Sequence, residues 1–89
     1  MDSPRENEAA LKAVGSNLRR ARASRDITLE VLAERANLNI RTLQKFEAGQ
    51  SNMLVTTLLR LRQGIGCPWE EILGSVRAKK QPQDRQPLE

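Results

Sequence analysis

Between residues 40 and 48, side chains that can hydrogen-bond to the edges of DNA bases alternate with apolar side chains. The polar set consists of Arg41, Thr42, Gln44 and Lys45. An arginine can pair with guanine through two parallel hydrogen bonds in the major groove of duplex DNA. Because Leu43 and Phe46 fall together on the other side of a helix, the segment predicts a helix that packs on one face and presents the polar set on the other. Solvated helical hairpins can show the same separation, so the pattern alone leaves both interpretations open.

Two short helices joined by a three-residue turn would hold this polar face in place. Thr28 and Asn39 are residue types that cap the starts of helices, and Gly49 is typical of a helix end. Asn37, in the turn, tolerates the left-handed conformation that a tight helix end needs. In such a helix-turn-helix the first helix braces across the DNA backbone and the second enters the major groove. The sequence therefore predicts this motif from about Thr28 to Gly49.

The rest of the chain is predicted to form three further helices and two polar ends. Apolar residues spaced by three and four indicate helices from about Pro4 to Ala21, from about Met53 to Ile65, and from Pro68 to before Gly74. We therefore expect an all-α fold of five helices. Residues 1–8 are predicted to be a polar N-terminal extension that can continue into the first helix, residues 9–74 the domain, and residues 75–89 a disordered basic tail.

Composition argues against several classes of site. The chain has no histidine and a single cysteine, Cys67, so it cannot form a disulfide within itself, and we expect no zinc or other metal site. No glycine-rich phosphate loop is present, and the serine and threonine side chains have no base beside them in the sequence. We therefore expect no enzymatic activity, no cofactor and no small-molecule ligand.

The charge of the chain favours an anionic partner. The net charge is +4, and residues 11–50, with eight basic and four acidic side chains, carry an excess of the same size. Such a balance attracts polyanions over a long range, although a solvated surface rich in arginine would give it too. No apolar run approaches the roughly 18 residues that span a membrane, and the acidic N-terminus is not typical of a signal peptide. We expect a cytoplasmic, nucleoid-associated protein.

From Leu11 to Leu73 the sequence resembles the Cro/cI-type helix-turn-helix family, which is also called lambda-repressor-like or XRE-type. Three segments carry the resemblance in order: LRRAR, TLEVLAERANLNIRTLQKFEAG and GCPWEEIL. The resemblance implies a five-helix DNA-binding domain with the helix-turn-helix at its second and third helices. It also implies that Arg22 and Glu47 form a structural ion pair that joins the first helix to the recognition helix.

The resemblance further implies which residues contact DNA. The residues expected to read bases are Ile40, Arg41, Thr42, Gln44 and Lys45. Those expected near phosphates are Thr28, Gln50, Ser51 and Asn52, with Arg19, Arg20 and Arg25 as further candidates. The additional arginines matter because the sequence departs from the family at Leu29, where many members carry a phosphate-gripping glutamine. The loop at residues 50–52 also lacks the basic side chains that many members have.

The function implied is that of a sequence-specific, double-stranded DNA-binding transcriptional regulator, most commonly a repressor that binds as a homodimer. Trp69, Ile72 and Leu73, at the end of the domain, are the candidate dimer surface. The alternative is an antitoxin or a bridging protein-interaction module in which DNA binding is secondary. Its protein partner, a toxin or the transcription machinery, would then be held by residues 3–10 or by the tail.

Overall fold

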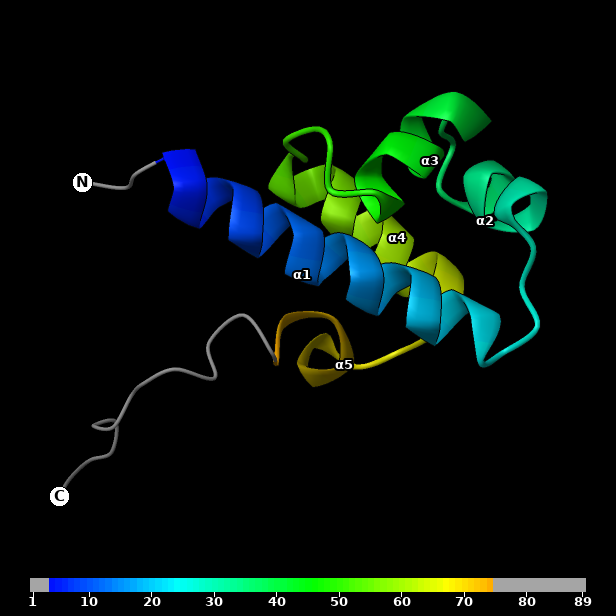
Figure 1. The fold of residues 1–89 in the computed structure, drawn as a ribbon. Helices are drawn as coiled ribbons and strands as arrows, with labels where there is room; N and C mark the ends of the chain where they lie inside the picture. The colour runs from blue at the N-terminus through cyan, green and yellow to red at the C-terminus, as the bar shows by residue number, and fades with distance from the viewer. Residues whose placement is uncertain (1–3, 75–89) are drawn as a thin grey trace, which may run out of the picture.

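The computed structural model describes residues 4–74, and within that range it contains five helices and no strand (Figure 1). The helices are α1 (Pro4–Ala23), α2 (Leu29–Arg35), α3 (Ile40–Glu47), α4 (Val55–Ile65) and α5 (Trp69–Leu73). The predicted all-α, five-helix fold is confirmed. The predicted N-terminal extension overlaps the start of α1, whereas the predicted tail lies outside the described residues.

The helix-turn-helix is set by local capping. The Thr28 hydroxyl accepts a hydrogen bond from the Val31 amide at 3.1 Å, and the Asn39 side chain accepts one from the Arg41 amide at 2.8 Å. Both caps satisfy amides that the first turn of a helix leaves unpaired. Between the helices Asn37 takes a left-handed conformation with φ of 55°, which reverses the chain direction after α2. Local contacts of Thr28 and Asn39 and the conformation of Asn37 therefore determine where the two helices begin and how the chain turns between them.

Helix α1 lies across the middle of the domain, with α3 and α4 on one side and α5 on the other (Figure 1). Gly15 lies where α1 meets the end of α3. A β-carbon at this position would collide with the carbonyl oxygen of Phe46 and would lie 2.7 Å from that of Glu47. The sequence alone presents Gly15 as a weak point in a helix. The structure shows that the missing side chain allows two helices to approach closely.

All five helices, or residues directly beside them, contribute to one hydrophobic core. Its buried apolar residues are Leu18, Ala21, Leu32, Ala33, Ala36, Leu43, Phe46, Leu61, Ile65, Cys67 and Ile72. Leu43 and Phe46 are the buried pair of α3, as its sequence pattern predicts. The same packing that stabilises the domain therefore also orients the exposed face of α3.

Helix α4 begins later than the sequence predicts. The sequence predicts a helix that starts at about Met53, but α4 starts at Val55 and Leu54 is its N-cap. Leu54 has no side-chain oxygen to accept a hydrogen bond from the first turn, and its side chain is 72% exposed. The apolar spacing predicts the buried face of α4 from Leu58 onward, whereas Leu54 precedes the helix in an extended conformation and is exposed.

Helix α5 is attached to α1 by polar contacts as well as by packing. The Asn17 amide donates a hydrogen bond to the carbonyl oxygen of Ile72 at 2.7 Å, and the Ile72 side chain is fully buried. The prediction that Ile72 belongs to a dimer surface is therefore wrong, because its side chain is part of the core. Trp69 and Leu73 remain half-buried and line a hollow on the surface.

A surface ion pair adds a second attachment of α5. The Arg25 guanidinium donates to both carboxylate oxygens of Glu71, at 2.7 and 2.9 Å. Hydrogen bonding to Arg25 lowers the pKa of Glu71 below its ordinary value of 4.5. The pair is solvent-exposed, so its contribution to stability is small and is weakened by salt.

This ion pair predicts a small acid sensitivity with a defined sign. Because the pKa of Glu71 is lower in the folded chain, the pair stabilises the fold fully above the ordinary value of 4.5. That stabilisation is lost as the pH falls through the lowered folded-state pKa. Urea unfolding of the wild type and of Glu71→Gln should therefore differ by a constant amount at neutral pH and converge in acid. A difference that grows as the pH falls would contradict the assignment.

Candidate nucleic-acid interface

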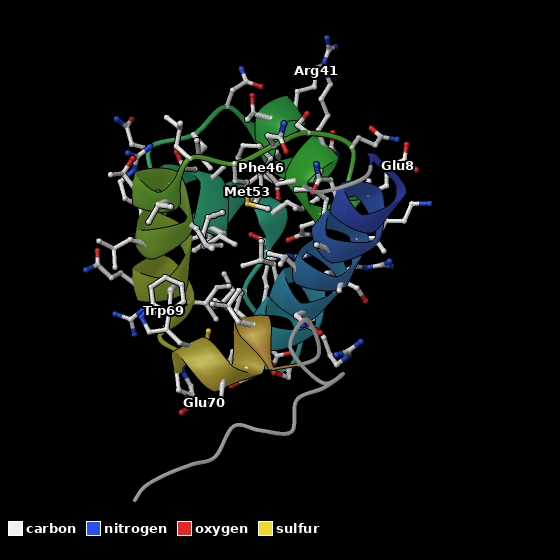
Figure 2. All side chains as sticks on the ribbon, turned by 90° about the vertical axis from the view of Figure 1, so that its left-hand side faces the viewer. Glu8, Arg41, Phe46, Met53, Trp69 and Glu70 are labelled. Carbon is white, nitrogen blue, oxygen red and sulfur yellow. The ribbon has the colours of Figure 1, made fainter. Side chains whose placement is uncertain are left out.

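Helix α3 presents its polar side chains at one end of the domain, where Figure 2 shows Arg41 pointing outward. Arg41, Gln44 and Lys45 are exposed, and Thr42 is half-buried beside them. We call these four residues the reading surface. Asn39 caps the helix through the Arg41 amide, so Arg41 lies in the first turn, where a recognition helix meets base edges.

Ile40 is less exposed than a base-contacting residue, which is the role predicted for it from the sequence. Its side chain is half-buried and packs against the core, so only part of it faces solvent at the start of α3. A methyl contact to thymine would have to use that exposed part. The structure therefore places Ile40 at the edge of the reading surface.

A bidentate ion pair supports the inner side of α3. Arg22 Nε donates to Glu47 Oε2 at 2.7 Å, and Arg22 Nη2 donates to Glu47 Oε1 at 3.1 Å. Arg22 Nη1 also donates to the carbonyl oxygen of Ile27 at 2.8 Å. The two side chains are only 14% and 7% exposed. Arg22 thus joins α1, the loop before α2 and the end of α3, which is the arrangement that the family resemblance implied.

A shallow cleft of about 290 Å³ lies beside the reading surface, between α1, α2 and α3. Its lining includes Arg19, Leu29 and Gln44. Leu29 is half-buried and packs on the core, so no amide side chain is available there to grip a phosphate. The exposed Thr28, whose hydroxyl caps α2 as an acceptor, still has a hydroxyl hydrogen to donate. Thr28 and Arg19 are therefore the phosphate-binding candidates on this side.

The loop after α3 borders the reading surface on its other side. Gly49 takes a left-handed conformation with φ of 72°, and a β-carbon there would lie 2.7 Å from the α-carbon of Lys12. The Gln50 amide closes the end of α3 by donating to the carbonyl oxygen of Lys45 at 2.9 Å. Gln50 and Asn52 are exposed and Ser51 is half-buried. Gly49 thus turns the chain so that two uncharged polar side chains lie beyond α3.

The three candidate arginines do not lie together. Arg19 lines the cleft with Gln44, whereas Arg20 donates to the Asn17 side chain at 2.9 Å, on the side of α1 that holds α5. Arg25 is engaged by Glu71 of α5, and Figure 2 places α5 at the opposite end of the domain from Arg41. The prediction that Arg20 and Arg25 replace the missing phosphate contacts is therefore not supported.

Other chemistry finds little support in the described residues. Within residues 4–74 no group of three or more histidine, cysteine, aspartate or glutamate side chains could hold a metal ion. Cys67 is buried, and burial raises the pKa of its thiol above the ordinary value, which is the behaviour of a packed residue and not of a reactive one. None of the helices in the described part of the chain is long and apolar enough to cross a membrane.

The sequence interpretation missed one set of surface residues. Leu54 and Val55 are 72% and 79% exposed at the start of α4, and Leu59 is 37% exposed one turn later. Their spacing could have revealed them, because residues 55 and 59 share a helix face that excludes the buried Leu61 and Ile65. This apolar surface lies outside the core and outside the reading surface.

Comparisons with known proteins agree with this geometry. A helix-turn-helix family model matches residues 18–72. The crystal structure of the restriction-modification controller protein C.AhdI from Aeromonas hydrophila is 26% identical, and the match covers 72% of this chain and 97% of that one with a TM-score of 0.68. The clp gene regulator ClgR from C. glutamicum is 24% identical, and the match covers 83% and 96% with a TM-score of 0.72.

No curated protein matches the chain. The family match covers more than half of the sequence and includes α2, α3 and the buried Arg22–Glu47 pair. The chain therefore belongs to the helix-turn-helix family of DNA-binding transcriptional regulators, of the Cro/cI or XRE type.

Proposed function

We propose that this helix-turn-helix protein binds a specific sequence in double-stranded DNA and represses transcription from the promoter that contains it. The observation that carries the proposal is the exposed polar face of α3 on a rigid, buried support. Arg41, Gln44 and Lys45 are exposed, while Leu43 and Phe46 of the same helix are buried. A helix held in this way can enter the major groove with its side chains already oriented.

The two sides of the reading surface supply sequence-independent contacts in this proposal. The first amides of α2, with Thr28 and Arg19, would hold a phosphate on one side. Gln50, Ser51 and Asn52 would lie near a phosphate on the other. Because these contacts include one arginine and no lysine, binding by a single domain is expected to be modest. A dimer bound to two half-sites about one helical turn apart would have a higher affinity for DNA than a single domain.

Arg41 is proposed to be the main base reader. Arg41→Ala should weaken binding to the preferred sequence by about 1–3 kcal/mol, which is a factor of roughly 5 to 150, because a bidentate contact to guanine is lost. The preferred sequence would first be selected from random duplexes, and affinities would then be measured by fluorescence anisotropy at several salt concentrations. Binding to unrelated DNA should weaken much less.

Arg20→Ala is the matched control, since it removes the same charge from the face of α1 that lies toward α5. It should leave the discrimination between preferred and unrelated DNA unchanged. Arg19→Ala should weaken binding to all sequences alike, as a phosphate contact would. Selection that yields no preferred sequence, or an Arg41→Ala variant that discriminates like the wild type, would overturn the proposed reading by α3.

Repression would follow from occupation of the promoter. A reporter gene placed behind the selected site should be expressed less when the wild-type protein is present, and Arg41→Ala should relieve this effect. Expression that rises with the wild-type protein would instead indicate an activator. Binding to chromosomal DNA would also place the protein at the nucleoid.

A further inference from the structure

The exposed residue Lys12 lies on α1, directly against the loop that follows α3. A β-carbon on Gly49, the residue after the C-cap of α3, would lie 2.7 Å from the α-carbon and 2.8 Å from the γ-carbon of Lys12. Because Gly49 has no side chain, the loop can pass over the first half of α1 at this distance, as Figure 1 shows. Lys12 is therefore held beside Gln50, the next residue of the loop.

The ammonium group of Lys12 has no partner within the described residues. It forms neither a hydrogen bond nor an ion pair there, and this includes Glu8, which lies one turn earlier on α1. The end of α3 does not need this charge as a cap, because the amides of Ala48, Gly49 and Gln50 already donate to its carbonyl oxygens. The charge of Lys12 is therefore available to an anion outside the domain.

The spacing of residues on α1 pairs Lys12 with Arg19. Residues seven apart share a helix face, and Gly15, which meets the end of α3, lies between them on that face. Arg19 lines the cleft on one side of α3 with Gln44, whereas Lys12 adjoins the loop on the other side. The rise of a helix separates Lys12 from Arg19 by about 10 Å along α1, close to the roughly 12 Å width of the major groove. The two cations are therefore spaced to reach phosphates on opposite sides of that groove.

Lys12 also lies where the loop after α3 lacks a positive charge. Residues 50–52 are uncharged, and two of the three arginines that were expected to compensate face α5 instead. Figure 2 places Glu8, one turn before Lys12, toward the end of the domain that carries Arg41. The first half of α1 thus supplies a lysine on the side of the domain where the loop supplies only uncharged polar groups.

We propose that Lys12 is a phosphate-binding residue whose ammonium group contacts the DNA backbone beside residues 50–52. The inference deepens the proposed function and rests on it, because it requires α3 to enter the major groove. Lys12 is 37 residues before Gly49, so the two meet only when α1 packs against α3. A phosphate contact carries no sequence information. Lys12 should therefore strengthen binding to all duplexes alike.

The test measures how the affinity of the full chain for DNA depends on salt, by fluorescence anisotropy with the selected duplex and with an unrelated duplex. Each neutralised phosphate contributes about 0.9 to the slope of log affinity against log salt concentration. Lys12→Ala should therefore reduce the slope by about 0.9 on both duplexes and weaken binding roughly tenfold at about 50 mM salt. Lys12→Arg should keep the wild-type slope, because it keeps the positive charge.

Two variants control for the position of the charge. Arg20→Ala removes an exposed cation from the side of α1 that holds α5, so it should leave the slope unchanged. Gln50→Lys, added to Lys12→Ala, returns a positive charge to the loop beside Gly49 and should restore the slope on both duplexes. The proposal is overturned if Lys12→Ala lowers the slope no more than Arg20→Ala does, or if Gln50→Lys does not restore it.

Thermal unfolding separates a DNA contact from a structural role of Lys12. Because Lys12 is exposed and without a partner in the described residues, Lys12→Ala should melt at the same temperature as the wild type. A lower melting temperature together with an unchanged slope would show that Lys12 stabilises the end of α3, and would contradict the phosphate contact.

Failure of this contact can be told apart from failure of the proposed function. If Lys12 does not bind phosphate but α3 reads DNA, Arg41→Ala will lose discrimination while Lys12→Ala keeps the wild-type slope. If Lys12 binds phosphate but the protein has no preferred sequence, Lys12→Ala will lower the slope on every duplex while Arg41→Ala leaves discrimination unchanged. The salt dependence thus tests Lys12, and the discrimination between duplexes tests the reading surface.

Discussion

Replacing Glu47 with alanine should lower the free energy of unfolding by about 3–5 kcal/mol, because it leaves a largely buried guanidinium without its carboxylate. Glu47 is 7% exposed, and it accepts two hydrogen bonds from Arg22, which is itself 14% exposed. In a domain of this size each kcal/mol moves the melting temperature by roughly 4–8 °C, so we expect a fall of at least about 12 °C. Thermal and urea unfolding followed by circular dichroism measure both quantities.

Two controls separate the unpaired charge from the loss of packing. In the double variant Arg22→Met with Glu47→Leu, both charges are replaced by apolar side chains of similar length, and more than half of the lost stability should return. Glu71→Ala removes the carboxylate of the exposed pair with Arg25 and should change the melting temperature much less. If Glu47→Ala and Glu71→Ala lowered the melting temperature equally, burial of the Arg22–Glu47 pair would not make the loss of its carboxylate more costly.

Gly15→Ala should have the second large effect on stability. For this variant the sequence and the structure predict changes of opposite sign in the free energy of unfolding. Helix propensity alone predicts that alanine would stabilise α1 by about 1 kcal/mol. In the structure the new methyl group would meet the carbonyl oxygens of Phe46 and Glu47, which belong to the backbone and cannot rotate away. Separating α1 from α3 should cost about 3 kcal/mol, so the variant should unfold at markedly lower urea concentration.

Gly64→Ala is the matched control within another helix. Its β-carbon would approach the end of the Leu32 side chain at 2.9 Å, and a side-chain end can shift more easily than a backbone carbonyl. The loss should therefore be smaller than for Gly15→Ala. A Gly15→Ala protein as stable as the wild type would mean that α1 and α3 do not approach as closely as the structure shows.

The parts of the fold that the sequence predicted are those set by local physics. Thr28 and Asn39 cap α2 and α3 through amides two or three residues away, so their residue types were sufficient to locate both helix starts. The 3.6-residue period placed Leu43 and Phe46 in the core and Arg41 on the surface. The start of α4 was missed because Leu54 caps it without a side-chain hydrogen bond, which leaves no residue-type signal.

The parts that the sequence could not predict depend on residues far apart in the chain. Arg25 pairs with Glu71, 46 residues later, and no local pattern links the two. The core position of Ile72 is defined by α1, through the hydrogen bond from Asn17 across 55 residues. Likewise, Gly15 has a neighbour only when α3 is in place. The Arg22–Glu47 pair was expected from the family resemblance and not from the composition or spacing of the residues.

Arg41, Gln44 and Lys45, the exposed residues proposed to contact bases, are separate from the buried residues that keep the domain folded. Exposed side chains away from caps and ion pairs usually change stability by no more than about 0.5 kcal/mol when replaced. The three positions can therefore accept many residue types while Leu43, Phe46 and Glu47 hold the helix unchanged. A lineage of such proteins could acquire new target sequences by drift at three surface positions, and a designer could follow the same route by randomising them on an intact scaffold.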